Sequence, residues 1–162
     1  RASAAARRLG GGPAGTIARD IWRIEAAMPK FGVDYTADHF PQEAALEERA
    51  VSFTKGCYTG QEVVARIKTY GGVNRRLVGL VIDGPAPAPG DKVFRDGADS
   101  GRITSAARSI TFSRAVAIAM VAMESAATGT LLQIASPDGP VAKVADIASP
   151  GTFPAFLQSC QR

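Results

Sequence analysis

Apolar residues recur at helical spacing early in the chain. Steps of three and four residues separate them, which is the spacing of one helix face. The residues are Ile17, Ile21, Ile24 and Met28. We predict a helix over residues 16–28 that is capped at its start by Thr16 and ended by Pro29. Arg19 and Arg23 lie four residues apart on another face, so both guanidinium groups can point the same way.

The following segment contains two shorter helical patterns. Residues 29–40 are rich in turn-forming residues and are expected to form a loop, and residues 41–49 are expected to form a short acidic helix. Thr59 and Glu62 have the T-x-x-E spacing of a capping box, which marks the start of a helix. We therefore predict a helix over residues 60–70, ended by two glycines.

The pattern changes after residue 72, where short apolar segments alternate with Pro- and Gly-rich turn signals. These segments have the length of β-strands. They span residues 75–82, 92–95, 100–109, 115–122, 130–134 and 141–144. Several short strands at regular spacing favour a small barrel or sandwich. The chain is therefore expected to combine a helical part with a β part.

These patterns divide the chain into three parts, with the main boundary near residues 72–76. The parts are residues 1–72, residues 73–148 and a loose tail over residues 149–162. The chain begins with Arg1 rather than Met, and we interpret it as a fragment of a longer protein. Residues 2–9 would then be the end of a helix that stops at the glycines that follow.

The composition narrows the class of protein. Of 162 residues, 46% are hydrophobic and 21% are charged, as in an ordinary globular domain. The net charge of +4 does not identify a nucleic-acid binder, and it fits one basic pocket for an anionic ligand equally well. The longest apolar run is far shorter than the roughly 20 residues of a membrane helix. We expect neither direct nucleic-acid binding nor a membrane span.

The two cysteines, Cys57 and Cys160, are too few for a disulfide scaffold and indicate free thiols in a reducing compartment. Cys57 precedes a predicted helix start, and Lys55 lies two residues away; both features favour the reactive thiolate. The alternative is that Cys57 is a small buried hydrophobic residue, which is common for free cysteine. Because an iron–sulfur cluster takes several thiolates, we predict no stably bound cluster.

His39 is the only histidine of the chain, and Glu43 lies four residues after it. The two side chains suggest a metal site, but a zinc ion needs more ligands than this pair provides. The neighbouring sequence does not supply them. We therefore interpret His39 as a loop residue and predict no metal site.

Several segments resemble the glycine cleavage T-protein superfamily. Residues 15–34 resemble its A-R-D-x-x-R-x-E-A-G helix and the loop after it, with Ala27 where the family usually has glycine. Further segments resemble strands of its C-terminal barrel; they are residues 75–80, 101–105 and 117–120. The resemblance implies an α+β fold. Its first part would be the remnant of a ferredoxin-like α/β half of a folate-binding domain, and its second a small antiparallel Greek-key β-barrel.

One motif resembles a single branch of this superfamily. Residues 55–62 read K-G-C-Y-T-G-Q-E, which is similar to the signature of the YgfZ-type folate-binding proteins. Eight residues with most positions fixed are a more specific signal than a lone glycine-rich match. T-proteins lack this signature.

The resemblance also implies roles for individual residues. Arg19 matches the arginine that contacts folate in T-proteins, and an ion pair with Asp20 or Glu25 is the alternative. Cys57 would be a reactive thiol, and four residues in or near the signature would bind tetrahydrofolate. The four are Lys55, Tyr58, Gln61 and Arg66, and for Arg66 a solvated helix face is the alternative. Arg23 and Glu25 are expected to pair at the interface with the barrel.

Three functions remain open. The YgfZ-type resemblance implies a tetrahydrofolate-binding accessory protein that supports iron–sulfur cluster assembly or repair, including that of cluster-dependent tRNA-modifying enzymes. Its partners would be client enzymes or assembly factors. The T-protein resemblance implies instead a tetrahydrofolate-dependent aminomethyltransferase, whose catalytic carboxylate lies in a half of the fold that this chain lacks. A module that only docks a client protein is the third possibility. We expect a cytoplasmic location, or the mitochondrial matrix in a eukaryote.

Overall fold

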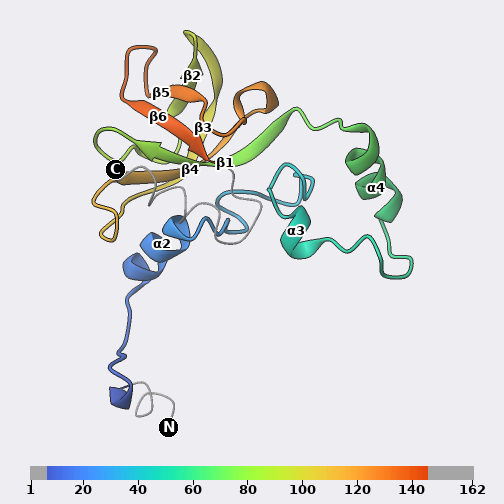
Figure 1. The fold of residues 1–162 in the computed structure, drawn as a ribbon, viewed down its shortest axis with the longest axis horizontal. Helices are drawn as coiled ribbons and strands as arrows, with labels where there is room; N and C mark the ends of the chain where they lie inside the picture. Colours follow the sequence, from blue (N-terminus) through green and yellow to red (C-terminus); the bar gives the residue numbers. More distant parts are fainter. Residues whose placement is uncertain (1–6, 146–162) are drawn as a thin grey trace.

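A closed β-barrel forms the main body of the fold, with α2 below it and α3 and α4 to its right in the view of Figure 1. The computed structural model of the chain describes residues 7–145. The α+β class and the antiparallel barrel that the sequence predicted are confirmed. Among the described residues before the barrel, helices and loops are present, and none adds a strand to the sheet.

Six strands form the barrel, and every neighbouring pair is antiparallel. They are β1 (Arg75–Ile82), β2 (Lys92–Arg95), β3 (Ala98–Arg108), β4 (Ala115–Ala122), β5 (Leu131–Ile134) and β6 (Val141–Ala145). The order around the barrel is β1-β4-β3-β2-β5-β6, and β6 pairs with β1 to close it. A short 3₁₀ helix, η1 (Met123–Ser125), follows β4. The strands lie close to the ranges that the apolar segments predicted.

β1 and β4 are buried on both faces. On β1, Val78 and Leu80 belong to the apolar interior of the barrel, whereas Leu77 and Val81 belong to a second apolar cluster outside it. That outer cluster also contains Ile24 from the helical part. Continuous apolar runs are typical of strands that are covered on both sides. The helical part therefore covers one outer face of the barrel.

The first described helix is α2 (Thr16–Glu25), which packs on β3 and β4. It is shorter than predicted, because Ala27 adopts a φ of +49° and ends the helix before Pro29 is reached. The helix starts after Gly15 without a side-chain cap, so the predicted Thr16 cap is wrong. Glycine adopts positive φ without strain, which explains why a relative would carry glycine in place of Ala27.

The predicted apolar face of α2 is only partly buried. Ile24 is 2% exposed and packs against the barrel, but Ile17 is 78% exposed. Met28, which lies beyond the helix, is also exposed. The barrel therefore covers the C-terminal end of α2 and leaves its first turn open to other contacts.

The acidic segment that follows forms turns and one short helix, α3 (Glu47–Ala50). The helix predicted over residues 41–49 is therefore wrong in its first part. Glu43 explains the difference, because its Oε2 accepts a hydrogen bond from the backbone N–H of Phe40 at 2.9 Å. Its Oε1 accepts a second bond from Arg75 Nε at 3.1 Å. The carboxylate thus holds a turn against the start of β1.

α4 (Gln61–Tyr70) lies away from the barrel, at the end of two extended connections (Figure 1). We call residues 51–72 the arm. One contact between the arm and the rest of the molecule comes from Gln42, whose Nε2 donates a hydrogen bond to the carbonyl of Val64 at 3.0 Å.

The predicted capping box on α4 is wrong. The helix begins after Gly60, which has a φ of +84°, and no side chain caps it. Gln61 forms a different bond, because its Oε1 accepts the backbone N–H of Tyr58 at 3.2 Å. The left-handed glycine turns the chain so that Gln61 stabilises the approach to the helix.

Some predictions fall on residues 1–6 and 146–162, which lie outside the described part of the chain. They concern the tail over residues 149–162, Cys160 and most of the helix predicted over residues 2–9. Within residues 7–145, every helix is too short or too polar to cross a membrane.

Candidate functional site

A buried carboxylate joins the helical part to the barrel. The Asp34 side chain is 0% exposed, and its Oδ2 lies 2.8 Å from Arg23 Nη1. Its Oδ1 accepts a hydrogen bond from Thr104 Oγ1 at 2.6 Å, and Arg23 Nη2 donates to Ser105 Oγ at 2.7 Å. A buried charge is tolerated only when it is paired and hydrogen-bonded. This cluster therefore fixes α2 and the following loop on β3.

Glu25 forms a second polar contact with the barrel. Its Oε1 accepts a hydrogen bond from Ser109 Oγ at 2.6 Å, and its Oε2 accepts one from Thr111 Oγ1 at 3.1 Å. The predicted pair between Arg23 and Glu25 is wrong, because each residue binds other partners. Both residues nevertheless lie at the interface with the barrel, where the pair was expected.

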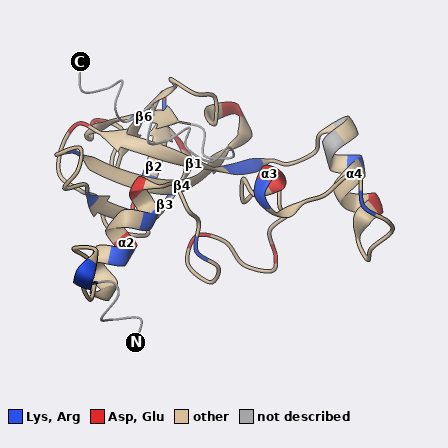
Figure 2. Cartoon of the chain, turned by 60° about the horizontal axis from the view of Figure 1, so that its bottom comes forward, with Lys and Arg blue, Asp and Glu red and all other residues tan. Residues whose placement is uncertain are grey.

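The folate-binding candidate Arg19 is exposed, one turn before Arg23 on α2. Among residues 7–145, no side chain forms a hydrogen bond or ion pair with its guanidinium group. The hydrogen bond from Arg23, with smaller charge effects of Lys30 and Arg19, holds the pKa of Asp20 below its ordinary value. Figure 2 shows the basic positions along α2. Arg19 therefore offers a planar set of donors to a ligand.

The signature lies on the arm, and its thiol is accessible. Cys57 is exposed, which contradicts the alternative of a buried hydrophobic residue. Lys55 Nζ lies 4.6 Å from the centroid of the Tyr58 ring, a cation–π arrangement. Because α4 begins only at Gln61, Cys57 lies outside its first turn.

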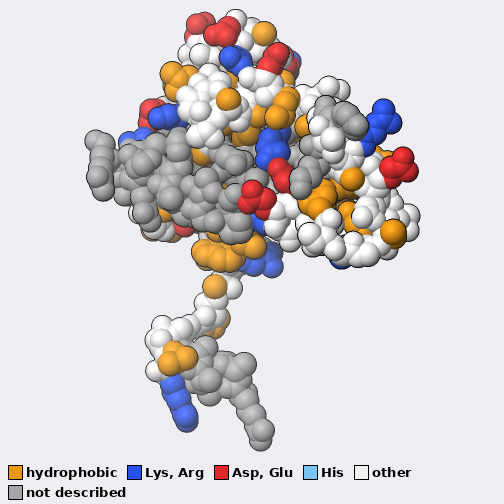
Figure 3. All heavy atoms as spheres, turned by 45° about the vertical axis from the view of Figure 1, so that its right-hand side comes forward, with side chains coloured by type: hydrophobic (Ala, Val, Ile, Leu, Met, Phe, Trp, Pro, Cys, Tyr) orange, Lys and Arg blue, Asp and Glu red, His pale blue; other side chains and the backbone are white. Residues whose placement is uncertain are grey.

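Arg66 lies on α4 beside exposed apolar residues. A hollow of about 310 Å³ is lined by Arg66, Phe40, Val63 and Ile67, among others. Figure 3 shows hydrophobic side chains on the surface of this part of the molecule. The arm therefore presents a mixed basic and apolar surface.

The predicted site residues fall into two separate groups. Arg19 lies on α2 against the barrel, whereas the remaining candidates lie on the arm, on the opposite side of the molecule (Figure 1). The remaining candidates are Lys55, Cys57, Tyr58, Gln61 and Arg66. The chain by itself does not bring these two groups together, and their roles stay predictions.

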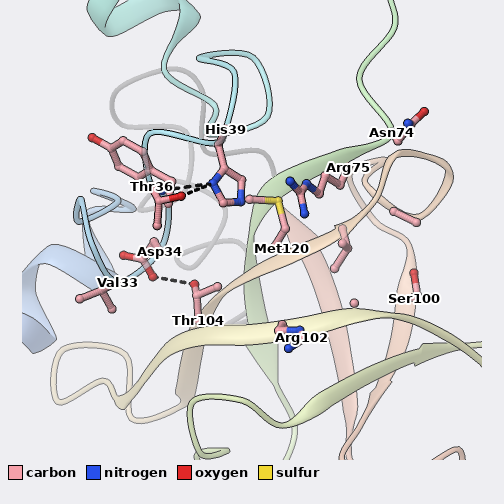
Figure 4. Close-up of a pocket in the computed structure, with 14 residues that line it drawn as sticks. Val33, Asp34, Thr36, His39, Asn74, Arg75, Ser100, Arg102, Thr104 and Met120 are labelled. Atoms are coloured by element: carbon pink, nitrogen blue, oxygen red, sulfur yellow. Dashed lines mark hydrogen bonds between the residues drawn. The ribbon is translucent and has the colours of Figure 1, made fainter.

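A cavity that the sequence did not predict lies between residues 33–39 and the outer face of the barrel. Its volume is about 570 Å³, and its lining includes His39, Arg75, Arg102 and Met120. Figure 4 shows His39 and Arg75 on one side of it and Arg102, from β3, on the other.

Only the register of the strands brings the cavity residues together. Arg102 pairs with Met120 across β3 and β4, and Arg75 lies opposite Ala122 across β1 and β4. These residues come from distant segments without a shared motif. His39 lies in a loop, as predicted, and its side chain also lines this cavity. Within residues 7–145, no cluster of three or more His, Cys, Asp or Glu side chains could hold a metal ion.

Comparison with known proteins finds a family model that the barrel matches. Residues 75–150 match the glycine cleavage T-protein C-terminal barrel domain. The barrel is therefore similar to that of the glycine cleavage T-protein superfamily. The structure of the aminomethyltransferase T of the glycine cleavage system from Bartonella henselae is similar, with a TM-score of 0.68 and 26% sequence identity. The similarity covers 78% of this chain and 36% of that protein.

The proteins with sequences similar to this chain are longer than it. An aminomethyltransferase of Moorella thermoacetica is 39% identical over 132 residues, which are 81% of this chain and 36% of that protein. An aminomethyltransferase of Bacillus subtilis is 32% identical over 123 residues, or 75% of this chain and 34% of that protein. A putative chloroplastic transferase of Arabidopsis thaliana is 37% identical over 93 residues, or 57% of this chain and 21% of that protein. The chain thus spans about a third or less of these relatives.

Proposed function

We propose that this chain forms part of a tetrahydrofolate-binding protein of the T-protein type, with aminomethyltransferase activity. The strongest support is the 39% identity to the Moorella thermoacetica aminomethyltransferase over 132 residues. This length exceeds the barrel, so the similarity continues into the segment before it. Of the two folate-related functions expected from the sequence, the comparisons favour the transferase.

The residues around Arg19 fit the chemistry of tetrahydrofolate. The pterin ring and the glutamate end of this molecule carry acceptors that suit a guanidinium group. Trp22 lies three residues after Arg19 on α2, and the two side chains are therefore neighbours on the helix surface. Trp22 is 58% exposed, so its ring offers a flat surface for stacking. We infer that Arg19 and Trp22 together contact the folate.

The substitution Arg19→Ala tests this function. We expect a loss of roughly tenfold in affinity for tetrahydrofolate, because one charge-assisted hydrogen bond is removed. Isothermal titration calorimetry on the full-length protein measures it, with the 162-residue chain titrated alongside. Arg108→Ala, an exposed arginine on β3, is the matched control and should bind as the wild type does. Absence of tetrahydrofolate binding by the full-length protein, or an unchanged affinity after Arg19→Ala in it, would overturn the proposal.

The accessory role in iron–sulfur cluster assembly or repair is a second candidate, supported by one observation. Cys57 is exposed within a complete K-G-C-Y-T-G-Q-E motif, so its thiol can reach a partner protein or a transient cluster. Clients or assembly factors of iron–sulfur enzymes would then be the partners of the arm.

Cys57→Ser distinguishes the two candidates. For an accessory protein, the activity of iron–sulfur enzymes in cells should fall while the thermal stability of the chain stays unchanged. Thr54→Ala, also exposed on the arm, is the control. Unchanged iron–sulfur enzyme activity together with intact tetrahydrofolate binding would exclude the accessory role and leave the transferase as the remaining candidate function.

A further inference from the structure

We propose that the cavity between residues 33–39 and the barrel is a binding site for an organic carboxylate. The cavity has a volume of about 570 Å³ and is separate from Arg19 and from the arm. This inference rests on the lining of the cavity, and it does not depend on the proposed transferase activity.

The one acidic residue in the lining does not repel an anion from the cavity. Asp34 Oδ2 accepts hydrogen bonds from Arg23 Nη1 and from the backbone N–H of Lys30, each at 2.8 Å. Its Oδ1 accepts one from Thr104 Oγ1 at 2.6 Å. The negative charge of Asp34 is therefore neutralised by Arg23, and its oxygens are occupied by donors.

Two arginines supply positive charge and donors. Arg75 uses Nε to bind Glu43 Oε1 at 3.1 Å, which leaves its two Nη groups for a ligand. Among residues 7–145, no hydrogen bond or ion pair occupies the side chain of Arg102. Asp99 interacts electrostatically with Arg102, but its carboxylate forms an ion pair with Lys92 at 2.8 Å. Arg102 is therefore the main uncompensated charge, and planar guanidinium forks match carboxylates.

His39 adds a neutral donor. The backbone N–H of Thr36 donates to His39 Nδ1 at 3.1 Å, so Nδ1 acts as an acceptor. In a neutral imidazole the other ring nitrogen then carries the proton. Figure 4 shows the ring extending from the loop toward Met120 and Arg75, with Nδ1 on the side of Thr36. His39 Nε2–H is therefore directed to the cavity side of the ring.

The apolar part of the lining favours an organic ligand over an inorganic anion. Val33 and Met120 line the same cavity as the two arginines, and Met120 belongs to the apolar cluster outside the barrel. Binding sites of this kind surround the apolar body of a ligand and place a few polar groups at its charged end. A carboxylate on an aromatic or aliphatic group of modest size satisfies both parts of the lining.

The single histidine makes the test specific to this cavity. The ring signals of His39 in an NMR spectrum report on ligand binding there, because no other histidine contributes. The probe is N-benzoyl-L-glutamate, and its diamide, which lacks the carboxylates, is the control ligand. Inorganic phosphate is the third ligand. We expect the first to shift the His39 signals in a saturable way and the other two to bind at least tenfold more weakly.

Arg102→Ala should weaken the binding of N-benzoyl-L-glutamate by roughly tenfold, the effect of losing one charge-assisted hydrogen bond. Arg108→Ala lies on the same strand, is exposed and removes the same charge, so it is the matched control. Equal affinities for wild type and Arg102→Ala would overturn the proposal. Equal binding of phosphate, or of the diamide, would overturn the assignment to an organic carboxylate.

A second reporter separates this site from the proposed folate contact. Trp22 is the only tryptophan and lies on α2 beside Arg19, so its fluorescence reports on that helix. If His39 and Trp22 both respond to tetrahydrofolate, the carboxylate is the glutamate end of folate. If the full-length protein fails to bind tetrahydrofolate but N-benzoyl-L-glutamate still shifts His39, the proposed function fails and the carboxylate site stands.

Discussion

The two regions attached to the barrel differ in how they are held. The segment from α2 to the loop at Asp34 is fixed by a buried ion pair, by hydrogen bonds to four barrel side chains and by apolar packing around Ile24. The arm carries the more specific sequence motif, yet its helix α4 packs less extensively on the other described helices and strands than α2 does, and a hydrogen bond from Gln42 is one of its links to them. A distinctive motif and a well-packed interface are thus different properties of this chain.

This contrast separates two kinds of constraint on the sequence. Around the barrel, a side chain is constrained by the atoms that it contacts within this chain, and substitutions there should change stability. On the arm, few internal contacts constrain the side chains, so the K-G-C-Y-T-G-Q-E motif requires a reason outside the packing of this chain. The substitutions below test the difference.

Gly101→Ala should have the largest effect. A Cβ at this position would lie 2.1 Å from the carbonyl oxygen of Met120, so β3 and β4 would have to separate. We expect a loss of about 4 kcal/mol or more in the free energy of unfolding, measured by urea denaturation. Gly56→Ala on the arm is the control, because its Cβ would meet nothing within 4 Å. Equal effects of the two substitutions would contradict the contrast between barrel and arm.

Asp34→Ala should cost about 3 kcal/mol of unfolding free energy, since it leaves Arg23 without its buried partner. The exposed pair between Asp83 and Arg114 is a matched control, with a distance of 2.9 Å against 2.8 Å for the buried pair. Asp83→Ala should cost at most about 1 kcal/mol, because solvent screens an exposed pair. Chemical denaturation of both variants measures the two losses of unfolding free energy. Because the two distances are nearly equal, a larger loss for Asp34→Ala is due to burial.

Thr59→Ala should have the smallest effect. A residue that caps a helix typically contributes about 1 kcal/mol, but Thr59 makes no capping bond to α4. We expect a change in helix stability below about 0.5 kcal/mol, measured by amide hydrogen exchange across α4. Faster exchange throughout the first turn of α4 in this variant would show that the capping box forms in solution.

The barrel was predictable because its signals are local. Alternating and continuous apolar segments indicate strands, and Pro- and Gly-rich segments indicate turns. The ends of helices were harder, because they depend on backbone angles that the sequence specifies weakly. Ala27 ends α2 in a left-handed conformation before Pro29 is reached. At the helix starts, Gly15 and Gly60 occupy the cap positions, so the side-chain motifs at Thr16 and Thr59 were misleading.

The cavity was not predictable for a different reason. His39, Arg75 and Arg102 come from a loop and two strands, and only the pairing of β1, β4 and β3 places them around one space. Even with every strand correctly assigned, the register would still have to be known, because a shift of one residue turns a side chain to the other face. The same limit applies to the pairing of Arg23, which was assigned to Glu25 and is made with Asp34.

The β-bulge in β3 has an evolutionary consequence. Consecutive strand residues normally face opposite sides, but the register shifts between Ile103 and Ser105. Thr104 and Ser105 can therefore both contact the helical part, one through Asp34 and the other through Arg23. A descendant that lost the extra residue of the bulge would have a regular strand here. That strand could direct only one of the two hydroxyls toward the helical part. Deletions here should therefore be inherited together with substitutions at Asp34 or Arg23.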